Sequence, residues 1–160
     1  MGFFNKLFGA EGAAEEKKAA RNSVRPSSQM GLDAKSAATI LTEIDIDTAI
    51  TAHENWKLRL QNYLNGNSAE TLQPEIVCQD DRCDLGKWLH GPGEKRLGKY
   101  PSFSVLVARH KYFHLQASTV VALVQANEKD KATQTLEGSY RHASTQVVLL
   151  LKDLKRGLGR

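Results

Sequence analysis

Residues 83–89 read Cys-Asp-Leu-Gly-Lys-Trp-Leu, and the rest of the chain is best understood from this stretch. It brings a thiol, a glycine and an indole together within six positions, which ordinary core segments seldom do. The stretch is followed by His90-Gly91-Pro92-Gly93, so we expect a short helix that ends at this glycine- and proline-rich turn. Cys83 is therefore the first candidate for a functional side chain.

Three histidines could meet this thiol in the folded protein. His53 lies upstream, and His110 and His114 lie downstream on one helical face, because residues four apart are one turn from each other. All three occupy apolar stripes. A single histidine on such a stripe is more often a hydrogen-bonded core residue than a ligand. Three that face one core together with a cysteine motif favour a metal site, and one thiolate with three imidazoles is a complete ligand set for tetrahedral zinc.

The same reasoning applies to two further histidines and a second cysteine. His90 lies in the Gly-Pro turn and His142 on a polar helical face, so neither is predicted to be a ligand. Cys78 precedes Cys83 by five residues. It is either a resolving thiol for an oxidised Cys83 or an incidental loop cysteine, and the sequence leaves both interpretations open.

The apolar pattern is helical throughout the rest of the chain. Apolar residues recur at three- and four-residue steps over about 38–64, from 102 to about 126, and over 129–155, with Ser102 as the expected N-cap of the middle segment. A short helical turn is expected within residues 68–79. The fold predicted is all-α, an antiparallel four-helix bundle with a short extra helix carrying the cysteine ligand.

The chain divides into one domain and two flanking segments. Residues 38–156 form the predicted bundle, 157–160 a short tail, and 1–37 a flexible tail too poor in apolar residues to fold alone. Within that tail, residues 3–8 could form a short amphipathic segment that contacts a membrane surface or a partner. Four apolar residues are few for stable membrane attachment, so a frayed tail is favoured.

Composition limits the partners and the compartment. The 160 residues carry a formal net charge of +4, with basic and acidic residues alternating, so no nucleic-acid footprint is expected. Two cysteines cannot build a disulfide framework, and we find neither a membrane span nor a signal peptide. The expected location is cytoplasmic.

Three motifs in this order resemble the chemoreceptor zinc-binding domain family: His53 followed by Trp56, the stretch 83–89, and the stretch 110–114 with its two histidines. The resemblance covers about residues 46–124. It implies a regulatory four-helix fold, often homodimeric, that is found in chemoreceptors and in diguanylate cyclases responding to zinc or oxidants. It also implies the zinc ligands, which are His53, Cys83, His110 and His114. Trp56, Gly86 and Trp88 are expected around them, with Gly86 allowing close backbone approach and Trp88 covering the metal.

An enzyme is not expected. Zinc proteases place a glutamate directly after the first histidine of their helical motif, whereas Lys111 follows His110 here. Four protein ligands leave no open position for a catalytic water. A di-iron bundle would need carboxylates inside the bundle, and the inner stripes carry none.

Two classes of function follow. The first is a sensory module that responds to zinc occupancy or to oxidation of Cys83 and is read by an unidentified signalling protein. The second is a protein-interaction bundle whose zinc is purely structural.

Overall fold

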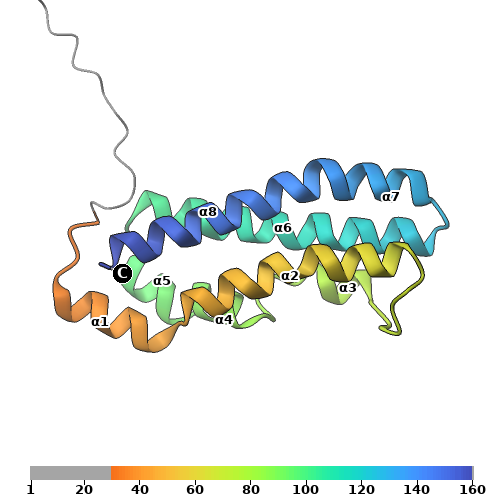
Figure 1. Cartoon of the computed structure of the whole chain (residues 1–160). Coiled ribbons are helices and arrows are strands. Elements are labelled where there is room, and N and C mark those ends of the chain that lie inside the picture. Colours follow the sequence, from red (N-terminus) through yellow and green to blue (C-terminus); the bar gives the residue numbers. More distant parts are fainter. Residues whose placement is uncertain (1–29, 160) are drawn as a thin grey trace, which may run out of the picture.

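The computed structural model describes residues 30–159, and these residues form helices without any strand (Figure 1). The expected amphipathic segment 3–8 and most of the predicted N-terminal tail lie outside the described residues. The elements are α1 (Ala34–Glu43), α2 (Ile46–Leu64), α3 (Pro74–Val77), α4 (Asp84–Leu89), α5 (Pro92–Leu97), α6 (Pro101–Gln125), α7 (Lys129–Thr135), the π-helical turn η1 (Leu136–Tyr140) and α8 (Arg141–Gly157).

Three long helical elements make the body of the domain: α2, α6 and the continuous run α7–η1–α8 (Figure 1). Polar contacts at the two ends show their directions. Lys155 Nζ near the end of α8 pairs with Asp47 at the start of α2 at 2.7 Å. At the other end, Gln125 in the last turn of α6 donates to the Tyr63 hydroxyl in the last turn of α2 at 3.1 Å. Thus α2 and α6 run in the same direction, and α7–η1–α8 returns in the opposite one.

The chain returns from α2 to α6 through the short helices α3, α4 and α5. Helix α3 packs against α6, and α4 follows it below α2 in the view of Figure 1. The all-α prediction is confirmed for the described residues. The regular four-helix antiparallel bundle stays a prediction, because three short helices, rather than one long one, make this return.

The expected first helix, 38–64, is in fact two helices. α1 ends at Glu43, and Ile44 and Asp45 both have extended backbone before α2 begins at Ile46. Asp45 explains the restart, because its carboxylate accepts a hydrogen bond from the Thr48 backbone N–H at 3.0 Å and so caps α2. A periodicity argument alone passes over this break, since the apolar stripe continues across it.

The other helix boundaries are close to those expected, with one correction. α6 begins at Pro101, the first-turn position that suits proline, and Tyr100 rather than Ser102 is its N-cap residue. α6 ends at Gln125, and Asn127 takes a left-handed φ of 61° that turns the chain into α7. α8 continues to Gly157, so the predicted tail at 157–160 starts within the last helical turn.

The core lies between the long helices. Phe113 of α6, Tyr140 of η1 and Leu151 of α8 are among its largest side chains, and all three are fully buried. The π-helical turn brings Tyr140 against Phe113, with ring centroids 5.4 Å apart. Phe113 in turn contacts His53 at 5.0 Å between centroids. Three elements thereby meet beside the histidines.

Replacement of Leu151 by alanine should reduce the free energy of unfolding by about 2–5 kcal/mol, because the side chain is fully buried and leaves a cavity. Lys152→Ala is the control on the same helix, since Lys152 is exposed. It should change stability by less than about 0.5 kcal/mol. Urea unfolding followed by circular dichroism measures both, and equal losses would contradict this assignment of the core.

Candidate metal centre

The structure brings the four predicted ligands to one point. One ligand atom from each of them lies within 4.8 Å of all the others. His53 comes from α2, Cys83 from the residue that caps α4, and His110 and His114 from neighbouring turns of α6. The three imidazoles are buried and the cysteine is half-buried.

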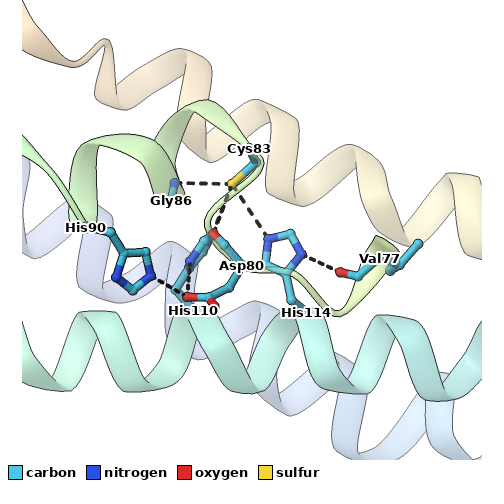
Figure 2. Close-up of polar contacts among 7 residues, drawn as sticks. All are labelled: Val77, Asp80, Cys83, Gly86, His90, His110 and His114. Atoms are coloured by element: carbon cyan, nitrogen blue, oxygen red, sulfur yellow. Dashed lines mark hydrogen bonds and ion pairs between the residues drawn. The ribbon is translucent and has the colours of Figure 1, made fainter. Parts of the chain in front are cut away.

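Backbone carbonyls fix the orientation of two of the rings. His53 Nδ1 donates to the Ala49 carbonyl at 2.6 Å, and His114 Nδ1 donates to the Val77 carbonyl at 2.8 Å. A neutral imidazole has one N–H, so donation from Nδ1 leaves a lone pair on Nε2. Figure 2 shows His114 held between Val77 on one side and Cys83 on the other.

Two distances within the cluster are close to those of a tetrahedral zinc site. Cys83 Sγ lies 3.3 Å from His110 Nε2 and 3.6 Å from His114 Nε2. Bond lengths of about 2.3 Å to sulfur and about 2.05 Å to nitrogen at a tetrahedral angle place these atoms about 3.6 Å apart. His53 Nε2 is buried and has no hydrogen-bond partner, which a bound cation would correct. The residues present therefore fit a zinc ion.

The sulfur of Cys83 sits at the start of a helix. Its Sγ accepts a hydrogen bond from the Gly86 backbone N–H at 3.3 Å and so caps α4. Burial raises the pKa of the Cys83 thiol, while hydrogen bonds from the Gly86 and Leu85 N–H groups act in the opposite direction and are outweighed. Without a cation the sulfur is thus held as a thiol, and a metal is needed to hold it as thiolate.

The histidines are held in the form that binds metal. Burial lowers the pKa of His53 and of His114, and it lowers the pKa of His110 to about 2, with the neighbouring histidines adding to the effect there. Neutral imidazole is the ligand form, so the fold itself keeps three ligands ready.

Gly86 of α4 lies directly against the backbone of the turn that precedes Cys83. A Cβ added at this position would lie 1.7 Å from the Asp80 carbonyl oxygen. That distance is far inside van der Waals contact, so only glycine lets α4 lie against the 80–83 turn. The close approach expected of this glycine is therefore present in the backbone.

The two tryptophans lie on different sides of the centre. Trp88 is buried, packs against Phe103 with centroids 6.0 Å apart, and donates to Glu43 at 3.3 Å. Trp56 is half-buried under the Arg59 guanidinium, which lies 4.0 Å from its ring centre. Each tryptophan lines a cleft that also reaches Cys83: one of about 500 Å³ with Trp88 and His53, and one of about 400 Å³ with Trp56 and His114. Solvent can approach the sulfur from both.

The remaining candidates are placed apart from the four-atom cluster. Cys78 ends α3, and its Sγ donates to the Glu75 carbonyl at 3.4 Å. A resolving role for this thiol stays a prediction. His142 is exposed on α8. His90 is no member of the cluster, but its Nε2 donates to Asp80 at 2.7 Å beside the site.

Sequence reasoning missed Asp80 and Glu43. Asp80 precedes Cys83 by three residues and approaches His110, while Glu43 receives hydrogen bonds from Trp88 and Arg96. The proximity of Asp80 to the cysteine motif in the sequence could have indicated that it lies beside the site. Nothing in the sequence around Glu43 indicates its two partners.

Residues 53–121 match the family model described as the chemoreceptor zinc-binding domain. The match begins at the first histidine and covers all four residues of the cluster. The resemblance expected from the motifs is thereby confirmed over these residues. No curated protein and no solved structure matches the chain significantly.

Within residues 30–159, none of the helices has the length and apolarity that crossing a bilayer requires.

Replacement of Gly86 by alanine should weaken zinc binding at least tenfold, because the new Cβ forces α4 and the Cys83 sulfur away from the histidines. Gly138→Ala is the matched control, since a Cβ there meets no atom within 4 Å. Competition with a chromogenic chelator measures the affinities. Equal affinities for the two variants would show that the close approach at Gly86 does not position the sulfur.

Proposed function

We propose that this chain is a cytoplasmic zinc-binding sensory module whose signal is a change at the zinc–Cys83 bond, caused by zinc loss or by oxidation of the sulfur. The observation that carries the proposal is the cluster of three buried imidazoles and one half-buried thiol within 4.8 Å. When bound, zinc would hold the sulfur as thiolate, the form that oxidants attack. His53, Cys83, His110 and His114 are the proposed ligands.

A sensory role is supported by where the single oxidisable ligand lies. The imidazoles are buried, whereas Cys83 lines both clefts next to the site. An oxidant that enters either cleft can therefore reach the sulfur. Two-electron oxidation by hypochlorous acid converts the thiolate to sulfenic acid and releases chloride, which removes a strong metal ligand.

The surroundings of Cys83 provide a route by which such a change could spread. The sulfur caps α4, so its displacement removes the hydrogen bond from Gly86. Trp88 on the same helix donates to Glu43 at the end of α1. Arg96 on α5 donates to the same carboxylate at 2.7 Å. A movement of α4 would thus act on α1 and α5 together.

Catalysis is not part of the proposal. Four protein ligands complete a tetrahedral zinc shell, and no position remains for a water or a substrate. The proposed output is a change in helix packing that a signalling protein reads.

The alternative is a bundle whose zinc is purely structural. It gains support from the way the ligands join α2, α4 and α6, because a structural metal would hold these three helices together. Circular dichroism after chelation distinguishes the two functions. A folded metal-free protein that rebinds zinc favours the sensor, and unfolding on zinc removal favours the structural role.

Mixing the zinc-loaded protein with one equivalent of hypochlorous acid should release zinc before methionine or tyrosine is oxidised. The reason is that the thiolate is the most reactive group and both clefts expose it. A chromogenic zinc chelator follows the release, and mass spectrometry assigns the oxidised residue. One zinc per chain is expected at the start.

The Cys78→Ser variant is the matched control, and it should release and regain zinc like the unaltered protein. Zinc that appears only after bulk methionine and tyrosine oxidation would rule out the sensor. A variant with His53, His110 and His114 all changed to alanine should carry no zinc, and full zinc content there would disprove the site itself.

We also propose a homodimer. Large apolar side chains are exposed on the long helices, among them Leu58 on α2, Leu115 on α6 and Leu149 on α8, each more than half exposed. Pairing would bury such surface. Light scattering at tens of micromolar should give twice the chain mass, and a monomer mass would contradict the proposal.

A further inference from the structure

Asp80 lies between the metal centre and the protein surface. It belongs to the turn that joins α3 to α4, and its side chain is only 15% exposed. His90 Nε2 donates to Asp80 Oδ2 at 2.7 Å, and the same carboxylate oxygen lies 3.8 Å from His110 Nδ1 (Figure 2). One carboxylate thus faces both a surface histidine and a buried one.

His110 differs from the other two histidines of the cluster. His53 and His114 each direct Nδ1 to a backbone carbonyl, whereas His110 Nδ1 is buried without a hydrogen-bond partner. Its Nε2 points toward Cys83 Sγ at 3.3 Å. If Nε2 binds a metal, Nδ1 must carry the proton of the ring, and a buried N–H without an acceptor costs about 1–3 kcal/mol.

We propose that Asp80 is the positioning residue for His110: with metal bound, its carboxylate accepts the His110 Nδ1–H, while His90 holds the carboxylate in place from the surface side. This inference rests on the proposed metal site. The two atoms are 3.8 Å apart and must approach by about 0.6–1.1 Å, since a hydrogen bond of this kind has a length of about 2.7–3.2 Å. A carboxylate acceptor orients the ring and increases the basicity of the opposite nitrogen.

The backbone ties Asp80 to the cysteine side of the site. The Asp80 carbonyl is the atom that a Cβ at Gly86 would meet at 1.7 Å, and Cys83 Sγ lies 4.0 Å from the same carbonyl. The backbone of Asp80 therefore has a fixed place relative to the sulfur, and its carboxylate is held beside His110 by the hydrogen bond from His90. Its negative charge also balances the formal +1 of a zinc ion bound by one thiolate and three neutral imidazoles.

The variant Asp80→Asn tests this role, with Asp81→Asn as the control that removes the same charge from an exposed neighbour. The full-length proteins are stripped with chelator and checked for folding by circular dichroism. Zinc affinity is then measured by competition at neutral pH. Loss of an outer hydrogen bond of this kind weakens metal binding about 10–100-fold, so Asp80→Asn should bind that much more weakly and Asp81→Asn like the unaltered protein.

Cobalt substitution gives a readout that a general loss of stability would not move. The visible bands of bound Co²⁺ report the field of the ligands, so Asp80→Asn should shift them, and Asp81→Asn should not. If Asp80→Asn binds zinc within twofold of the control and its cobalt spectrum is unchanged, the proposal is overturned. If the unaltered protein takes up no zinc, the metal centre itself is disproved instead.

Should Asp80→Asn fail to fold, nitrogen-detected NMR of the zinc-loaded, unaltered protein decides the question. The expected result is a proton on His110 Nδ1, shifted downfield by a charged acceptor and slow to exchange. A ring with its proton on Nε2, or an Nδ1 proton that exchanges freely with solvent, would overturn the proposal.

Discussion

Three buried imidazoles and one half-buried thiol converge on a common centre, and much of the surrounding structure serves to hold them there. The single Cys83 thiol proton cannot satisfy all the lone pairs that face this centre, whereas one bound cation would. The carbonyls of Ala49 and Val77 keep two rings turned inward. The centre thus joins α2, the cysteine turn and α6, which are far apart in the sequence.

The sequence was sufficient to predict the cluster because each member stands out against a simple pattern. His53, His110 and His114 interrupt apolar stripes where leucine or valine would be expected, and Cys83 opens a compact motif with one glycine. Periodicity also predicts α6 and the course of the last helical run well. These features depend on local spacing, which a sequence records directly.

Other features depend on contacts between distant segments, and spacing does not record them. Glu43 meets Trp88 and Arg96, which lie 45 and 53 residues further on. The turn geometry that brings His90 to Asp80 likewise appears only once α4 is folded against the 80–83 turn. The break between α1 and α2 could have been predicted from Asp45, a residue type that often caps helices. The apolar stripe continues across the break, however, and periodicity therefore predicts one helix.

The carboxylate of Glu43 has a mechanical consequence. Glu43 is the last residue of α1 and stands directly before the extended residues that separate α1 from α2. Its carboxylate accepts one hydrogen bond from α4, the helix that Cys83 caps, and another from α5. The extended residues Ile44 and Asp45 can serve as a hinge between α1 and α2, and the Glu43 carboxylate restrains this hinge through its two hydrogen bonds. A force on α1 would therefore pass to α4 and α5 through the Glu43 carboxylate, and to α2 through the two extended residues.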